Sequence, residues 1–447
     1  MTSPGAAEVE LLAGYLGPFL ERQRWFARKE EGGAGEPRVI EAEVLLPGRP
    51  GLTDLVVAAG DATYHVLVGV REEQEALGIL RGQEHAILGP LGEDDGHSLA
   101  YGALADPELA LQLLEIVSGG RQQATRVRSV GAEQSNTSMV YDDRLIMKVF
   151  RRLQAGPNPD VEVTLALDEV GFNHVAAPMA VWHRDPWDLA LVQEFLAGGS
   201  EGWALALTSL RDLYASGPET APEAAGGDFG DEARRLGEMT AKLHLALAEA
   251  FGRHRAQPDE WARSIRQQLD AVPQSEGVIG PGTGAILDDL RSVAAPGVAI
   301  RVHGDYHLGQ VMRGEVGWYV LDFEGEPARP LAERRELRSP LRDVAGMLRS
   351  FQYATALAAE ERGPAGQADV AELAVAWEQR NRRAFLEGYS SGTHIDELVP
   401  GDEAGFETVL AAFELEKAAY ELCYELAYRP AWAHIPRQAL ERLRGEA

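Results

Sequence analysis

The sequence contains a single cysteine, Cys423, among its 447 residues. One cysteine cannot form a disulfide within the chain, which fits a reducing compartment such as the cytoplasm. The chain also lacks any run of eighteen apolar residues, and residues 1–5 begin neither a basic segment nor an apolar secretory signal. We therefore expect a cytoplasmic protein that does not span or bind a membrane.

Basic residues are also scarce compared with acidic ones. The sequence has 42 Lys and Arg against 70 Asp and Glu, which gives a net charge of −28. Nucleic-acid binding is therefore not expected, because phosphate contacts need clustered basic side chains. A nucleotide is not excluded, because one lysine, a metal ion and backbone amides are enough to hold its phosphates. An acidic surface also suits a cationic small molecule.

The pattern of apolar residues and turns predicts three regions, since a chain of this length exceeds a single core. Residues 1–105 predict a small α+β cap, with a helix over 11–28 and strands within 38–46 and 55–70. Residues 106–198 predict a β-rich region with strands at 125–130, 139–141, 144–150 and 187–196, and a helix at 161–169. Residues 199–447 predict a mostly helical region, with long helices over 231–251, 346–359, 368–389 and 404–428.

The stretch 302–326 carries the strongest chemical signal. It places Asp305 in a short polar turn, Gln310 five residues later and Asp322 after an apolar, strand-like run. The series H-G-D-x-x-x-x-Q followed by D-F-E is similar to the H-R-D-x-x-x-x-N and D-F-G elements of protein kinases. In phosphoryl transfer Asp305 fits the carboxylate that orients and deprotonates a hydroxyl, and Gln310 and Asp322 fit ligands of Mg²⁺. The alternative is a hairpin whose carboxylates are only solvated.

Upstream residues supply a candidate nucleotide site. Lys148 interrupts an apolar strand, as the kinase lysine that holds phosphates does, and Glu162 at the start of the next helix is a fitting partner. The alternative for Lys148 is an edge-strand lysine that faces water. A polar loop before this strand and a hinge at 197–200, preceded by backbone that would meet the adenine edge, complete the candidate ATP site, with residues Gln134, Ser135, Asn136, Thr137, Ser138, Glu194, Phe195 and Leu196.

Two later helices carry further polar signals. Asp343 lies near a helix start, where it can cap the helix or brace the catalytic stretch. In the helix over 404–428, Glu414, Glu421 and Glu425 share one stripe. Tyr420 and Tyr424, one turn apart, and Trp432 beyond the helix could supply aromatic surface for a sugar ring. The alternative for the glutamates is a solvated acidic face.

Taken together, these motifs resemble the aminoglycoside-phosphotransferase-like kinases and, within them, the actinobacterial maltokinases. The shared stretches are residues 131–138, 307–310, 322–327 and 339–351. The resemblance implies an α+β, bilobal protein-kinase-like fold with an N-terminal cap, a β-rich N-lobe and a mostly helical C-lobe. It also implies ATP as donor and a sugar as acceptor, with Asp305 as base, Gln310 and Asp322 as Mg²⁺ ligands and Lys148 as phosphate clamp.

The acceptor side departs from the maltokinase pattern. Tyr306 follows the predicted base where maltokinases commonly carry leucine, and residues 424–430 lack one arginine of the maltokinase series Y-E-A-R-N-R-P. Loss of an arginine beside acidic residues leaves room for an ammonium group on the substrate. The predicted acceptor residues are Asp305, Tyr306, His307, Tyr420, Glu421, Tyr424, Glu425 and Trp432.

Actinobacterial glucosamine kinases are relatives of the maltokinases, so we expect phosphorylation of glucosamine at its 6-hydroxyl. A maltokinase that forms maltose 1-phosphate is the first alternative. A sugar-binding pseudokinase module and an aminoglycoside-modifying kinase are further alternatives. The presence of Lys148, Asp305 and Asp322 counts against the pseudokinase, and the maltokinase-like stretches count against the aminoglycoside kinase.

Overall fold

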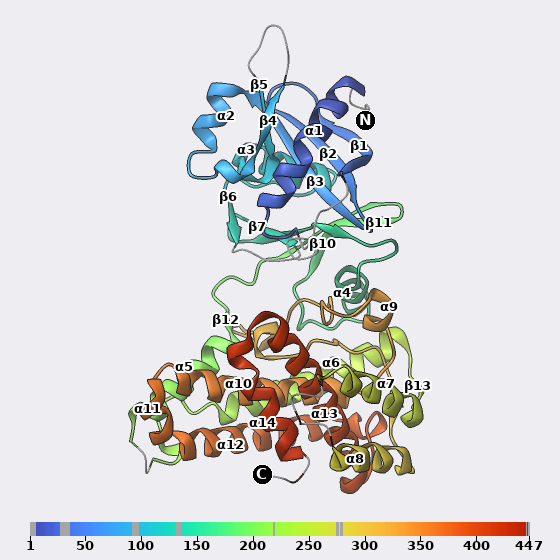
Figure 1. The fold of residues 1–447 in the computed structure, drawn as a ribbon, viewed down its shortest axis with the longest axis vertical. Coiled ribbons are helices and arrows are strands. Elements are labelled where there is room, and N and C mark those ends of the chain that lie inside the picture. The colour runs from blue at the N-terminus through green and yellow to red at the C-terminus, as the bar shows by residue number, and fades with distance from the viewer. Residues whose placement is uncertain are drawn as a thin grey trace. The chain divides into compact units, whose positions relative to one another are not determined.

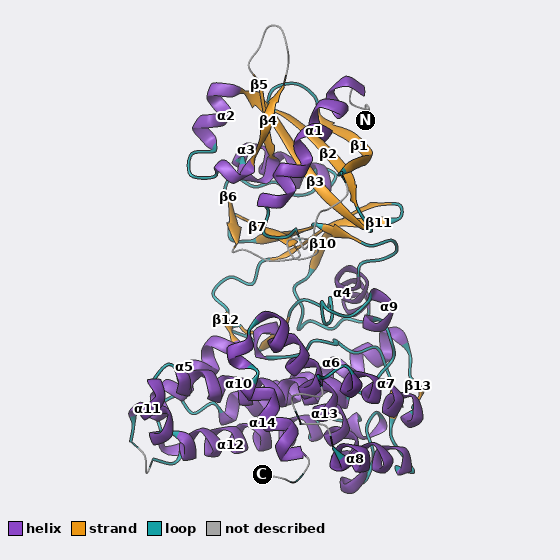
Figure 2. Ribbon diagram, in the orientation of Figure 1, coloured by secondary structure: helices purple, strands orange, loops and turns teal. Residues whose placement is uncertain are grey.

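A computed structural model describes residues 6–26, 36–91, 98–130, 136–217, 220–273, 277, 280–443 and 445. The chain divides into two compact units, one of residues 1–162 with 176–197 and one of residues 163–175 with 198–447. Sheets dominate the first unit and helices dominate the second (Figure 2). In the described part of the chain, no helix is long and apolar enough to cross a membrane.

The first unit begins with a helix packed on an antiparallel sheet (Figure 1). The helix α1 (Ala6–Arg22) contacts the outer strands β4 and β1, and its Leu12, Leu16 and Phe19 share a core with residues of β2 and β3. The sheet order is β1-β2-β3-β5-β4, and β9 also pairs with β3. Its strands are β1 (Arg38–Leu46), β2 (Gly51–Ala59), β3 (Ala62–Glu72), β4 (Ile87–Leu91), β5 (Ser98–Gly102) and β9 (Arg152–Leu153), and α2 (Glu73–Ile79) follows β3.

A second antiparallel sheet completes the first unit, in the order β10-β11-β8-β7-β6. Its strands are β6 (Val127–Val130), β7 (Asn136–Tyr141), β8 (Leu145–Phe150), β10 (Pro178–Arg184) and β11 (Trp187–Glu194). The helix α3 (Pro107–Val117) contributes Leu109, Leu113 and Leu114 to a core that contains residues of both sheets. The predicted boundary at 105–106 falls just before this helix, and the division into cap and N-lobe stays a prediction.

The second unit is built from helices around one large apolar core. Its long helices are α5 (Gly202–Ala215), α6 (Gly230–Phe251), α7 (Pro258–Asp270), α8 (Pro281–Ser292), α10 (Leu341–Glu360), α12 (Ala371–Ser390), α13 (Glu403–Tyr428) and α14 (His434–Leu443). Two short helices, α9 (Leu331–Arg334) and α11 (Gly363–Asp369), lie between them, and α4 (Pro159–Glu169) spans the division between the units. The helices α6 and α12 pack along each other, as do α10 and α13.

Small strands position the candidate catalytic stretch in this helical unit. The strands β15 (Val311–Arg313) and β16 (Trp318–Val320) form a hairpin, and β12 (Ser200–Glu201) extends it. A further short pair joins β13 (His254–Arg255) to β14 (Val298–Ala299). The hairpin places Gln310 directly before β15 and Asp322 two residues after β16, so both lie at the same end of the hairpin.

Candidate active site

The loop that carries Asp305 is held by the first turn of α10. The Asp343 carboxylate accepts hydrogen bonds from the backbone N–H of His303 at 2.8 Å and of Gly304 at 2.9 Å. The neighbouring Arg342 donates to the carbonyl of Gly304 at 3.1 Å. The expectation that Asp343 braces the catalytic loop is therefore confirmed. Gly346 allows this close approach, because a Cβ there would lie 2.6 Å from the carbonyl oxygen of Tyr306.

Asp305 itself is paired with a lysine from α13. Its Oδ1 lies 2.9 Å from Nζ of Lys417, and its Oδ2 lies 3.8 Å from Nε2 of His307. Burial alone would raise the pKa of the Asp305 carboxyl, but the Lys417 ammonium and His307 outweigh it and lower that pKa. Asp305 is therefore ionised at neutral pH, as a group that takes a proton from a hydroxyl must be.

Gln310 and Asp322 lie side by side, as the spacing predicts for two ligands of one ion. The amide of Gln310 is 3.4 Å from Oδ2 of Asp322. Asp322 has a φ of 61°, a left-handed conformation that is uncommon for a residue with a Cβ, although aspartate adopts it more readily than most residues. A carboxylate and an amide are hard oxygen donors of the kind that Mg²⁺ prefers, so the pair fits that ion. Their role as metal ligands stays a prediction.

A pocket of about 420 Å³ opens beside Asp305 within the second unit. This volume lies in the range of small-molecule sites. Seven of the predicted acceptor residues line it: Asp305, His307, Tyr420, Glu421, Tyr424, Glu425 and Trp432. Helices α5 and α10 add Trp203, Tyr353 and Leu357 to its wall. The structure thus brings together residues that are separated by more than a hundred positions in the sequence.

The glutamates of the α13 stripe are not a solvated acidic face. Glu414 pairs with Arg382 at 2.7 Å and Glu421 pairs with Arg349 at 2.6 Å. Glu425 pairs with Arg429 at 2.8 Å through Oε1, and the Tyr353 hydroxyl donates to the same oxygen at 3.2 Å. Arginines from the neighbouring helices and from the end of α13 therefore neutralise much of the negative charge that the sequence places here.

One carboxylate oxygen on this stripe is left for a ligand. Oε2 of Glu425 is buried and has no hydrogen-bond partner among the described residues. A buried acceptor without a partner costs about 1–3 kcal/mol, so it favours a bound donor. Burial raises the pKa of the Glu425 carboxyl above its ordinary value, while Arg429 and Tyr353 act in the opposite direction. Glu425 is therefore the best-placed acid for recognition of a donor in this pocket.

Tyr306 does not line the acceptor pocket, which corrects the sequence-based assignment. Its side chain is only 1% exposed, and its hydroxyl lies 2.8 Å from Oγ1 of Thr240 in α6. The aromatic ring packs against His303 with ring centroids 5.4 Å apart. The change from leucine to tyrosine at this position therefore affects packing behind the loop, and it says nothing about the acceptor.

The first unit holds the candidate phosphate clamp. Nζ of Lys148 lies 2.9 Å from Oδ2 of Asp160, in the first turn of α4 and two residues before the predicted partner Glu162. Lys148 therefore has an orienting carboxylate in this unit, and the role of Glu162 stays a prediction. Gln134 and Ser135 of the predicted phosphate loop lie outside the described residues.

The described end of that loop lies at the start of β7. Asn136 and Ser138 are buried there, and the Thr137 hydroxyl accepts a hydrogen bond from Nε of Arg151 at 2.8 Å. The hydroxyl of Thr137 is thus already engaged by Arg151, which lies between β8 and β9. Any contact between these three residues and a nucleotide stays a prediction.

The segment before the predicted hinge lies at the end of β11 in the same unit. The N–H groups of Glu194 and Phe195 donate to the carbonyls of Ala177 at 2.9 Å and Arg144 at 2.8 Å. The carbonyl of Phe195 in turn accepts from the N–H of Ala197 at 2.8 Å. The hinge assignment stays a prediction.

Lys417 is the main residue that the sequence motifs did not reveal. Its ion pair with Asp305 joins positions 112 residues apart, and sequence spacing does not encode such a contact. The composition nevertheless singles out the lysines, because the sequence contains only four of them against 38 arginines. Two of the four, Lys148 and Lys417, pair with carboxylates at the candidate sites.

Comparison with known proteins agrees with the fold and with the predicted resemblance. Residues 19–106 match a family model described as the maltokinase N-terminal cap domain. A glucosamine kinase from Streptacidiphilus jiangxiensis is 29% identical over 358 residues, which cover 76% of this chain and 78% of that protein. A glucosamine kinase from Mycolicibacterium smegmatis is 28% identical over 350 residues, which cover 74% and 83%.

Solved structures extend the comparison to the whole chain. A glucosamine kinase in complex with glucosamine, ADP and inorganic phosphate matches with a TM-score of 0.65 and 22% identity, over 99% of this chain and all of that one. A further crystal form matches with a TM-score of 0.64 over 98% of this chain. The chain therefore has the α+β, kinase-like fold of these proteins, with a cap, a β-rich N-lobe and a helical C-lobe. The predicted fold class and the predicted resemblance to the maltokinase and glucosamine kinase branch are confirmed.

Proposed function

We propose that this protein is an ATP- and Mg²⁺-dependent sugar kinase that phosphorylates glucosamine at its 6-hydroxyl. The observation that carries the acceptor assignment is Glu425, which lines the same pocket as Asp305 and whose buried Oε2 has no hydrogen-bond partner among the described residues. An ammonium group gains from a nearby ionised carboxylate, and a charged hydrogen bond of this kind contributes about 1.5–3 kcal/mol. The similarity to two glucosamine kinases supports the same acceptor.

The catalytic roles follow from the geometry around the loop. Asp305 would orient the acceptor hydroxyl through Oδ2 and take its proton, because Lys417 already holds Oδ1. Gln310 and Asp322 would hold Mg²⁺, which when bound offsets negative charge on the nucleotide phosphates. Lys148, oriented by Asp160, would add positive charge to those phosphates. The aromatic rings of Tyr420 and Tyr424, 6.3 Å apart and stacked, would face the sugar ring.

We also assign the protein to the cytoplasm, because its single cysteine fits a reducing compartment.

Maltokinase activity is the second candidate, and the match of residues 19–106 to the maltokinase cap favours it. The two candidates differ in the charge that the pocket must recognise. Maltose is neutral and has no group that needs the charge of Glu425, whereas glucosamine carries an ammonium group near neutral pH. The retained Arg429, which pairs with Glu425, is compatible with either sugar.

ATP consumption with Mg²⁺ against a panel of maltose, glucose, glucosamine, N-acetylglucosamine and an aminoglycoside tests this proposal. We expect turnover on glucosamine and little on N-acetylglucosamine, because acetylation removes the charge. Turnover on maltose alone would replace glucosamine by the second candidate. Absence of ATP consumption with every sugar would favour a sugar-binding pseudokinase module, and selective turnover of the aminoglycoside would favour an antibiotic-modifying kinase.

A further inference from the structure

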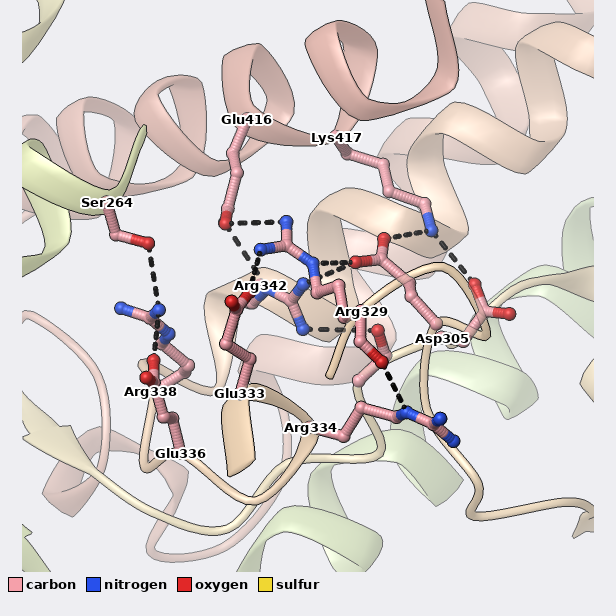
Figure 3. Close-up of polar contacts among 12 residues, drawn as sticks. Ser264, Asp305, Arg329, Glu333, Arg334, Glu336, Arg338, Arg342, Glu416 and Lys417 are labelled. Carbon is pink, nitrogen blue, oxygen red and sulfur yellow. Dashed lines mark hydrogen bonds and ion pairs between the residues drawn. The ribbon is translucent and has the colours of Figure 1, made fainter. Parts of the chain in front are cut away.

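The ammonium of Lys417 bridges two acids at the floor of the pocket. Its Nζ lies 2.9 Å from Oδ1 of Asp305 and 2.8 Å from Oε1 of Glu326. The side chain is only 14% exposed, and Figure 3 shows it reaching from α13 down to the catalytic loop. A lysine in this position is held at two points, so its ammonium has a fixed place beside the predicted base.

The same lysine ends a buried ionic network. Glu326 pairs with Arg329 and, at 2.8 Å, with Arg342, and Glu416 pairs with the same two arginines at 3.1 and 3.2 Å (Figure 3). With Asp305 and Lys417 the buried members are three acids and three bases, so their charges balance, and the partly exposed Glu333 also lies 3.5 Å from Arg329. A buried network is stable only when its charges are matched, because an unpaired buried charge costs several kcal/mol. Removal of Lys417 would leave Asp305 beside an excess of negative charge.

The contacts of the two Asp305 oxygens differ. Oδ1 lies 2.9 Å from Nζ of Lys417, and Oδ2 lies 3.8 Å from Nε2 of His307. Both Lys417 and His307 line the pocket. A hydroxyl that enters the pocket therefore meets Oδ2, with the carboxylate already oriented by the lysine.

We propose that Lys417 is a positioning residue for phosphoryl transfer, which fixes the Asp305 carboxylate through Oδ1 and leaves Oδ2 to the acceptor hydroxyl. This inference rests on the proposed kinase function, and it does not depend on which sugar is the acceptor. The other titratable or charged groups that face this carboxylate are His307 on the same loop, Glu326 after the hairpin, and Tyr420 on α13. Among the described groups that face this carboxylate, Lys417 supplies the permanent positive charge.

The variants K417M and K417R test the proposal, with K242M as the matched control because Lys242 is exposed on α6. The pH profile of kcat/KM is measured with whichever sugar of the panel the wild-type protein uses best. In K417M we expect the acid limb to move to higher pH, so that the ratio of variant to wild-type kcat/KM is more than about tenfold lower at pH 6 than at pH 8. K417R should restore the position of the acid limb, and K242M should leave the profile unchanged.

A uniform loss of kcat/KM at all pH values in K417M, with no rescue by K417R, would overturn the proposal and leave Lys417 a packing residue. An error in the proposed acceptor would be distinguished from an error about Lys417, because the wild-type protein would then turn over another sugar instead of glucosamine. If no sugar is turned over, the pH dependence of the melting temperature decides. Wild-type Asp305 and Glu326 have lowered pKa values, so their stabilisation is still present at pH 5 and is lost as pH falls further, and the wild-type melting temperature should drop more than that of K417M between pH 5 and pH 3. Equal drops would also overturn the proposal.

Discussion

The Nε and Nη2 atoms of Arg349 both donate to Oε2 of Glu421, at 2.9 and 2.6 Å. This contact joins α10 to α13 directly behind the pocket, and the arginine side chain is only 3% exposed. The Arg349 guanidinium therefore neutralises the charge of the Glu421 carboxylate. The proposed selectivity for a cationic acceptor, which the sequence suggested for the whole acidic stripe, would therefore rest on Glu425.

The variant R349M should destabilise the protein, because it leaves the carboxylate of Glu421 without its cation. Breaking one partner of a buried pair costs about 3–5 kcal/mol. The double variant R349M/E421M should recover most of this loss, since it removes both charges and keeps apolar volume. Denaturant unfolding of the wild-type protein, both single variants and the double variant measures the coupling. Additive losses in the double variant would show that the two residues do not stabilise each other.

The variant E425Q should weaken the binding of glucosamine selectively. Glutamine keeps the shape and an acceptor oxygen, but it removes the charge that attracts the ammonium group. Loss of a charged hydrogen bond of about 1.5–3 kcal/mol corresponds to a rise in KM of at least tenfold. The KM for glucose, which has no amine, is the control and should change far less. Equal effects on both sugars would mean that Glu425 contacts a hydroxyl that they share.

The pH dependence of glucosamine binding should follow the protonation of Glu425. Burial raises the pKa of this carboxyl, so protonation begins nearer to neutral pH than for an exposed glutamate. As pH falls through the raised pKa, the carboxylate loses its charge while the substrate amine keeps its own. Calorimetric titration with glucosamine between pH 5 and pH 8 should show affinity falling on acidification, and E425Q should bind weakly at every pH. A wild-type affinity that does not change with pH would contradict this assignment.

The proximity of Gln310 and Asp322 could be predicted from the sequence because the segment that carries them is local, while their roles stay predictions. The interval from Asp305 to Gln310 is fixed by one turn, and the hairpin that separates Gln310 from Asp322 is short. The strands of the first sheet were also visible, although the run over 55–70 is split by a turn at Gly60 into β2 and β3. The prediction omitted α7, although Trp261, Ile265 and Leu269 recur every four residues along it and are buried.

The partners of the charged residues could not be predicted, because each lies far away in the sequence. Lys417 meets Glu326 across 91 positions, and Arg349 meets Glu421 across 72. Without the fold, the glutamates of α13 were equally compatible with a solvated face and with a substrate site. Tyr306 illustrates the opposite error, since a residue next to the base in sequence points away from the pocket and into the core.

The variant D343N should lower both the stability of the protein and the turnover rate, because it loosens the loop that carries Asp305. Asparagine offers one acceptor oxygen where Asp343 receives the N–H groups of both His303 and Gly304, so one buried donor loses its partner. An unsatisfied buried N–H costs about 1–3 kcal/mol. We expect a comparable loss of unfolding free energy together with a clear fall in kcat, because the loop that carries Asp305 is released. The control D288N changes an exposed aspartate on α8, and it should affect neither quantity. Wild-type kcat in D343N would show that the loop is held by other contacts.

The variant D305N should abolish most turnover while it preserves the fold. The amide oxygen that this substitution introduces could still accept a hydrogen bond from Lys417 at the Oδ1 position, so the loop and the pocket should keep their shape. The amide cannot take a proton from the acceptor hydroxyl, and loss of a general base lowers kcat by about 10²–10⁴. We expect KM to stay within a few-fold of the wild-type value, measured by ATP consumption, with a melting temperature close to wild type. A kcat within tenfold of the wild-type value in a folded variant would mean that another group accepts the proton, and His307, 3.8 Å from Asp305, would then be the residue to change.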